Sequence, residues 1–279
     1  LCRGGSGGQG LGTHEIRALH SAVCSDPHLR PEGLLLLHGF SGSTSTFAAL
    51  EPALIQAGFA VQAPLLRGHG RDSPQALAGV TWSDWLDDAS SALAELRARA
   101  GSVIVVGHSM GALLAALLAA EQSTAIDSLV LAAAPVRLAS PLAPGRPLAF
   151  LTPLLGRLLP RWPMPRHYAD PALAASDTSY PWVPMDALLS FLQLSVVVRR
   201  RLAEVHQPVL ILQSRADRVV APAAADLLAS GLGTPSEQLR MVGFERSGHE
   251  LFRDCEEGAV IASVLQFVDE RINRRPVAP

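Results

Sequence analysis

The chain of 279 residues is long enough for one large domain, or for a core that carries an insertion. Its hydrophobic fraction of 48% predicts a sizeable buried interior and excludes a largely disordered chain. The formal net charge of −2, with no block of like charges, offers no basic surface for nucleic acid, so we expect no nucleic-acid partner. The cysteines, Cys2, Cys24 and Cys255, are too few and too scattered to indicate a disulfide framework or a zinc site.

The N-terminal residues are rich in glycine. Residues 1–12 lack the apolar central region of a secretory signal, so we expect a cytoplasmic protein. Residues 16–24 are expected to form an early edge strand, so that residues 1–32 make a lead-in with one strand.

Short apolar runs then alternate with helical segments. The expected strands and helices lie, in chain order, at 33–38 (strand), 43–57 (helix), 59–63 (strand), 81–99 (helix), 102–106 (strand), 112–120 (helix), 126–133 (strand), 208–213 (strand), 223–230 (helix), 239–244 (strand) and 256–272 (helix). This order, with short connections, predicts right-handed crossovers. We therefore expect an α/β fold with a mostly parallel central sheet and helices on both faces.

The alternation breaks over residues 136–205, which hold ten of the 21 prolines. We expect an inserted helical cap here, with a helix at 188–198, that divides the core into segments 33–135 and 206–279. The alternative is an irregular structural excursion. If the segment is a cap, its apolar side chains are expected to line an acyl pocket: Leu148, Phe150, Leu151, Leu154, Leu155 and Trp162.

A G-x-S-x-G sequence lies between the β-branched run 103–106 and the Ala/Leu-rich segment 112–120. This context predicts a nucleophile elbow with Ser109 at its tip. Gly107 and Gly111 lack a Cβ, which lets strand and helix approach closely while the backbone of the serine is held in a strained turn.

This segment allows two other interpretations. Residues 103–120 are nearly all apolar, but His108, Ser109 and two glycines interrupt a membrane span, so we expect no stable membrane insertion. The segment could also be a glycine-rich structural turn without chemistry. The nucleophile interpretation is favoured only if the chain also contains catalytic partners for Ser109.

A serine hydroxyl needs a histidine to take its proton and an acid to orient that histidine. Asp217 lies in the loop after one expected strand, and His249 lies in the loop after the next. Asp226 and Asp254 are the substitutes for the acid, although both fall within or at the start of expected helices. The chain order Ser109, Asp217, His249 is the order found in α/β-hydrolases.

Four segments carry a resemblance to a known family: Leu-Leu-His-Gly-Phe at 36–40, Gly-His-Ser-Met-Gly at 107–111, Ala-Asp-Arg-Val-Val at 216–220 and Ser-Gly-His at 247–249. In this order they resemble the capped α/β-hydrolase superfamily, and within it the bacterial carboxylesterase and monoacylglycerol lipase group. The resemblance covers about residues 33–272 and is weakest in the cap.

A tetrahedral intermediate needs hydrogen-bond donors where its oxyanion develops. Met110, the residue after the nucleophile, supplies one backbone N–H, and the resemblance implies that Phe40 supplies the other. The long glycine run of some esterases is absent after His38. We expect His38, His69 and His108 to hold loops in place by hydrogen bonds.

We therefore expect a serine carboxylic ester hydrolase that cleaves short- to medium-chain acyl esters, with monoacylglycerols among the candidate substrates, through an acyl-enzyme intermediate. Its partner is a small-molecule ester, and we expect no cofactor and no metal. Serine at the elbow disfavours haloalkane dehalogenases and epoxide hydrolases, which use aspartate there. An amidase or carbamate hydrolase, a thioesterase, a lactonase, a carbon–carbon bond hydrolase and a non-catalytic ligand-binding scaffold remain alternatives. The sequence carries no signal for the oligomeric state.

Overall fold

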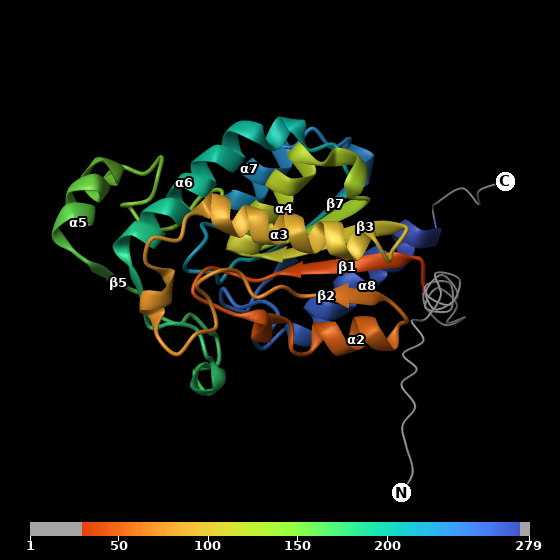
Figure 1. The fold of residues 1–279 in the computed structure, drawn as a ribbon, viewed down its shortest axis with the longest axis horizontal. Helices are drawn as coiled ribbons and strands as arrows, with labels where there is room; N and C mark the ends of the chain where they lie inside the picture. The colour runs from red at the N-terminus through yellow and green to blue at the C-terminus, as the bar shows by residue number, and fades with distance from the viewer. Residues whose placement is uncertain (1–29, 274–279) are drawn as a thin grey trace, which may run out of the picture.

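The computed structural model describes residues 30–273, and the edge strand expected at 16–24 lies outside them. Within this range the core is a six-stranded sheet in which every strand pair is parallel (Figure 1). Its order is β2-β1-β3-β4-β7-β8, formed by β1 (Glu32–Leu37), β2 (Ala60–Gln62), β3 (Ser102–His108), β4 (Ser128–Ala132), β7 (Val209–Ser214) and β8 (Leu239–Phe244). The expected α/β class with a parallel central sheet is confirmed.

The two faces of the sheet are covered by different helices (Figure 1). One face packs against α3 (Trp82–Arg97), α4 (Met110–Glu121) and α7 (Ala224–Gly231), and α6 (Met185–Arg201) lies over α3 and α4. The other face packs against α2 (Leu50–Gln56) and α8 (Glu257–Asn273). In β3, Val103 and Val105 join the first core, whereas Ile104 and Val106 join the second. Successive strand residues point to opposite faces, so a continuous apolar run is buried on both sides.

The helix expected at 43–57 was wrong in its first half. A 3-10 turn, η1 (Thr44–Phe47), begins there with the Ser43 side chain accepting the Ser45 N–H, and α2 starts only at Leu50. Pro52 has no N–H to donate, so it is tolerated in the first turn of a new helix but not in the middle of a longer one. The expected loop before α3 also contains a short 3-10 helix, η2 (Pro74–Leu77).

Residues 136–205 connect β4 to β7, and we call them the insertion. Within it, α5 (Thr152–Leu158) and the short antiparallel pair β5 (Arg161–Pro163) and β6 (Trp182–Pro184) project from one end of the sheet (Figure 1). The remaining elements are the 3-10 helices η4 (Ala149–Leu151), η5 (Leu173–Ser176) and η6 (Leu202–Glu204). Helix α6 is longer than the 188–198 expected, because its C-terminal half continues over the core and packs on α4.

Helix α4 is apolar around its whole circumference. Ten of its 12 residues are buried, since the sheet lies on one side and other helices lie on the other. An all-apolar helix can be either a buried core helix or a membrane span. None of the helices in residues 30–273 combines the length and apolarity needed to cross a bilayer.

The turn between β3 and α4 depends on two glycines. A Cβ on Gly111 would lie 1.8 Å from the backbone oxygen of Leu37, and one on Gly107 would lie 2.3 Å from the backbone oxygen of Gly111. Between them, Ser109 has φ +53° and ψ −118°, a strained conformation for a residue with a side chain. The helix therefore starts in direct backbone contact with the end of β1.

The same glycine-to-alanine change should have opposite effects in two helices. Gly111→Ala places a methyl group against backbone that cannot move aside, and it should lower the free energy of unfolding by about 3 kcal/mol. Gly258→Ala, also in the second position of its helix, meets nothing within 4 Å and should be neutral or stabilise by up to about 1 kcal/mol. Urea unfolding followed by circular dichroism measures both, and equal stabilities of the two variants would contradict the close approach.

Candidate active site

Three side chains from distant parts of the sequence converge at the carboxyl edge of the sheet. Ser109 follows β3, Asp217 lies in the loop after β7, and His249 lies in the loop after β8. The Ser109 hydroxyl lies 2.9 Å from Nε2 of His249, and Nδ1 of His249 lies 2.9 Å from Oδ2 of Asp217. The structure thus brings together the serine, histidine and aspartate singled out in the sequence.

Asp217 is buried and fully engaged by hydrogen bonds. Its Oδ1 accepts the backbone N–H groups of Val219 at 2.8 Å and Val220 at 3.0 Å. Its Oδ2 accepts from Nδ1 of His249 and from the side-chain amide of Gln213. Burial favours the neutral acid, but the His249 charge and these hydrogen bonds prevail and hold the pKa of Asp217 below its ordinary value. The residue is therefore a carboxylate at neutral pH.

His249 is buried between its two partners. Burial alone would lower its pKa, but the Asp217 carboxylate and its hydrogen bond outweigh burial and hold the pKa of His249 above its ordinary value. Because a carboxylate can only accept, Nδ1 carries the proton and Nε2 is left to accept from the Ser109 hydroxyl. This is the tautomer that a general base for the serine requires.

Two backbone N–H groups beside Ser109 are available to an oxyanion. Met110 begins α4, where the first N–H groups have no acceptor within the helix. Phe40 lies in the loop after β1, its ring stacked on Phe191 of α6 at 5.0 Å and tilted against Trp85 of α3 at 5.5 Å. Over the part of the chain that the structure describes, neither N–H donates to another group. Both groups therefore remain free for a substrate.

Two buried histidines maintain the shape of the loop that carries Phe40. The pKa of His38 is lowered to about 4 and that of His69 to about 3, in both cases chiefly by burial, so both rings are neutral. His38 accepts the N–H of Leu66 at 3.2 Å on Nε2 and donates to the carbonyl of Gly39 at 2.9 Å from Nδ1. These contacts connect two loops at the edge of the sheet.

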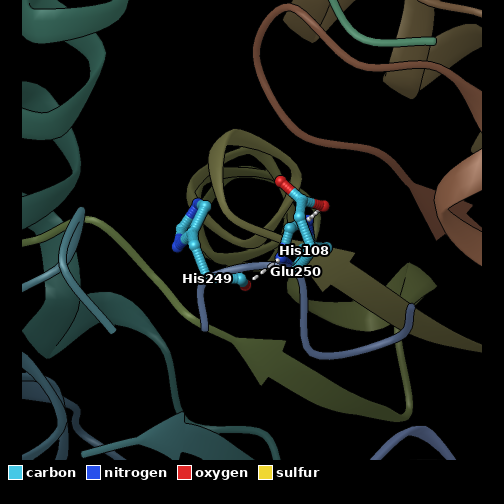
Figure 2. Close-up of side chains that lie close together, drawn as sticks. All are labelled: His108, His249 and Glu250. Atoms are coloured by element: carbon cyan, nitrogen blue, oxygen red, sulfur yellow. Dashed lines mark hydrogen bonds and ion pairs between the residues drawn. The ribbon is translucent and has the colours of Figure 1, made fainter. Parts of the chain in front are cut away.

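His108 supports the loop on the other side. Its Nε2 donates to the backbone carbonyl of His249 at 3.0 Å, and its Nδ1 lies 4.0 Å from the carboxylate of Glu250 (Figure 2). Ligand atoms of His108, His249 and Glu250 lie within 4.8 Å of one another, the spacing of a conceivable metal site. Since Asp217 and Ser109 already occupy both ring nitrogens of His249, the cluster is better explained as support for the histidine.

A small cavity opens beside Ser109 and adjoins a larger one. The smaller, about 70 Å³, is lined by Ser109, His249 and polar groups that include Ser41, Asp177 and Glu250. The larger, about 380 Å³, is mainly apolar and lies between the insertion and the loop after β7. The residues that line both cavities are Met164, Pro165, His167, Phe191 and Val219. An apolar chain in the larger cavity can therefore place its polar end at the serine.

Of the six residues predicted to line an acyl pocket, Leu155 and Trp162 line the larger cavity and the other four do not. Phe150 and Leu154 are 73% and 53% exposed, Leu148 is also exposed, and the half-buried Leu151 does not line the cavity. Only one face of a short helix can face the cavity, and both faces of α5 are apolar, so the sequence pattern could not separate them.

The attachment of the histidine loop to the insertion is not visible in the sequence pattern. The backbone N–H of His249 donates to the carbonyl of His167 at 3.1 Å. The buried Asp254 accepts the N–H of Gly248 at 2.6 Å and that of Ala169 at 2.7 Å on one oxygen. Asp254 therefore holds the histidine loop against the insertion and does not orient the imidazole. Asp226, the other candidate for the acid, is exposed on α7.

Known proteins are similar to this chain in both sequence and fold. Over residues 31–256 the chain matches the Hydrolase_4 family, described as serine aminopeptidase, S33. It is 28% identical over 239 residues to a thermostable monoacylglycerol lipase of Bacillus sp. (strain H-257), covering 85% of this chain and 90% of the relative. It is 23% identical over 240 residues to a carboxylesterase of Bacillus subtilis (strain 168), covering 86% and 93%.

Solved structures agree with this relationship. A chain reported for LipS and LipT, two metagenome-derived lipolytic enzymes, superposes with a TM-score of 0.78 at 27% identity, covering 86% of this chain and 94% of its own. The family match spans most of the chain and includes Ser109, Asp217 and His249. The protein thus belongs to the Hydrolase_4 family of α/β-hydrolases.

Proposed function

We propose that the protein is a serine carboxylic ester hydrolase for short- to medium-chain acyl esters, with monoacylglycerols among its substrates. One observation carries the proposal: Ser109, His249 and Asp217 are linked by two hydrogen bonds of 2.9 Å, and the small cavity at Ser109 and His249 shares five lining residues with an apolar cavity of about 380 Å³. The lipase and esterase names of similar proteins support the same reaction class.

In this proposal Ser109 attacks the ester carbonyl carbon while Nε2 of His249 takes the hydroxyl proton. The negative charge on the carbonyl oxygen is held by the N–H groups of Phe40 and Met110. His249 then gives its proton to the departing alcohol, which leaves an acyl group on Ser109. A water molecule, deprotonated by His249, then attacks this acyl-enzyme, and His249 returns that proton to the Ser109 oxygen as the bond to the acyl group breaks and the acid leaves. Asp217 keeps the imidazole in the required tautomer throughout.

The substrate class is argued from the cavities. Leu138, Leu142, Leu155, Leu188 and Leu192 line the larger one, and such a surface favours an acyl chain. The smaller cavity offers hydroxyl and carboxylate groups that suit a polar alcohol. In this proposal the insertion is a cap over the acyl chain.

Amide hydrolysis is the second candidate, because the matching family is described as a serine aminopeptidase. The same serine and histidine could serve either reaction, since both pass through an acyl-enzyme. A matched ester and anilide with the same butyryl group separates them. Faster turnover of the ester supports the leading proposal, and faster turnover of the anilide reverses the order.

Removing the nucleophile tests the reaction itself. Ser109→Ala should lower kcat for p-nitrophenyl butyrate by about 10⁵- to 10⁶-fold, because no other group can form the acyl-enzyme. Ser263→Ala changes a half-buried serine of α8 whose hydroxyl donates only to the backbone carbonyl of Ala259, and it should leave the rate unchanged. Stopped-flow absorbance of released p-nitrophenol measures both rates. The assignment of Ser109 as the nucleophile is rejected if the Ser109 variant turns over at more than about one-thousandth of the wild-type rate.

The pH dependence follows from His249, which must be neutral to act as a base. Its pKa lies above the ordinary value of 6.5, so kcat/KM should fall as the pH falls through a midpoint above 6.5. Asp217→Asn removes the carboxylate that raises the pKa of His249, so burial then lowers that pKa and the midpoint should move to lower pH. The value of kcat/KM on the high-pH plateau should fall by about 10⁴-fold. Asp226→Asn, at an exposed position on α7, is the matched control. A midpoint that Asp217→Asn leaves in place would contradict this coupling.

Filling the larger cavity should shorten the preferred acyl chain. Leu155→Trp narrows the space that an acyl chain needs, so kcat/KM should drop at least about tenfold for decanoyl esters and little for acetyl esters. Leu154→Trp makes the same change one residue away on the exposed side and should leave the profile intact. Initial rates across p-nitrophenyl esters from acetyl to palmitoyl provide the comparison. Identical profiles in the two variants would place the acyl chain elsewhere.

A further inference from the structure

The outer surface of the insertion is unusually apolar. Five of the nine strongly exposed large apolar side chains in residues 30–273 lie within twelve consecutive positions: Leu148, Phe150, Leu154, Leu158 and Leu159. Phe150 is 73% exposed and Leu158 is 67% exposed. We call these five residues the outer patch. Clustered apolar exposure of this kind marks an interaction site, whereas single exposed residues elsewhere, such as Ile55 and Met241, need no explanation.

The charged residues that flank the outer patch in the sequence are mostly arginines. The chain has no aspartate or glutamate from residue 128 to residue 169, but it has arginines at Arg137, Arg146, Arg157, Arg161 and Arg166. Of these, only Arg166 forms an ion pair within the described range, with Asp177. Asp186, the acid of α6 that follows β6, is held by the backbone N–H of Gly79. With Asp186 as the one acid on the neighbouring start of α6, the surroundings of the outer patch carry net positive charge.

This combination fits an anionic lipid surface better than a second copy of the chain. A two-fold dimer through the outer patch would bring two copies of the same arginine-rich surface together, where like charges repel. A bilayer with anionic headgroups instead pairs with arginines and accepts leucine and phenylalanine side chains at the boundary with its acyl region. Helix α5 also projects from the body of the molecule (Figure 1), so a flat surface can reach it.

The outer patch lies across a thin layer of protein from the larger cavity. Thr152 and Leu155 of α5 line the cavity, whereas Leu154 and Leu158 of the same helix face outward. We propose that the protein docks peripherally on anionic membranes through the outer patch, with Arg157 and Arg161 pairing with lipid headgroups. The docking does not depend on ester hydrolysis, so it can be tested without it.

Co-sedimentation with lipid vesicles tests the proposal. The full-length protein should bind vesicles of phosphatidylcholine mixed with phosphatidylglycerol, more weakly at high salt, and should bind pure phosphatidylcholine less. Leu154→Ser combined with Leu158→Ser should weaken binding to the mixed vesicles at least about tenfold. Arg157→Gln combined with Arg161→Gln should weaken it by about tenfold or more and should remove most of the salt dependence.

Matched controls separate docking from folding and catalysis. Ile55→Ser combined with Met241→Ser removes two exposed apolar side chains elsewhere and should bind like the wild type. The Ser109→Ala protein should also bind like the wild type, so inactivity does not count against docking. Unfolding temperatures and turnover of a soluble butyrate ester should be unchanged in the leucine variant, since its two side chains lie outside the cavity.

Three results would overturn the proposal. The first is no sedimentation of the wild type with anionic vesicles, and the second is equal loss of binding in the outer-patch and control variants. The third is a wild-type protein that does not bind vesicles but forms a dimer in analytical ultracentrifugation, when the leucine variant is a monomer. That result would make a second copy of the chain the occupant.

Discussion

The close backbone contact between the start of α4 and the end of β1 is the constraint on which the rest of the site depends. Gly111 has no Cβ and so lets the helix begin against the Leu37 carbonyl, which leaves Ser109 only the strained turn between strand and helix. The same contact points the first N–H groups of α4, with the positive end of the helix dipole, at the space beside the serine hydroxyl. Nucleophile position and oxyanion stabilisation are therefore one consequence of one packing arrangement.

The histidine is attached to the core through His108 of β3, which donates to its backbone carbonyl, and its position also depends on the insertion. The backbone of His249 is bonded to His167, and Asp254 joins Gly248 to Ala169, so the histidine loop and the insertion form one hydrogen-bonded unit. A Cβ on Gly248 would lie 2.2 Å from the carbonyl oxygen of His167, which shows how closely the two segments approach. Any shift of residues 167–169 would therefore move the imidazole relative to Ser109.

The sequence predicted those parts of the structure that local patterns determine. The strands were predictable because runs such as 103–106 are buried on both faces, and the elbow because its glycines flank the serine at fixed spacing. The role of Asp254 was not predictable, because its partner Ala169 is distant in the sequence and offers only a backbone N–H. The face of α5 that lines the cavity was not predictable for another reason. Leucines occupy both faces of this helix, so the periodicity of apolar residues does not distinguish them.

This contrast separates the chemistry of the site from its selectivity. Ser109 and Asp217 follow central strands whose register is set by many parallel hydrogen bonds, so the reacting groups are held by the rigid sheet. The cavity wall instead comes largely from the insertion, where short elements such as α5 and β5 have few neighbours. Because a short element can turn or shift with little loss of buried area, Leu155 and Trp162 can be replaced or moved without disturbing the serine. Changes of substrate within this fold are therefore expected to arise in the insertion before they arise in the core.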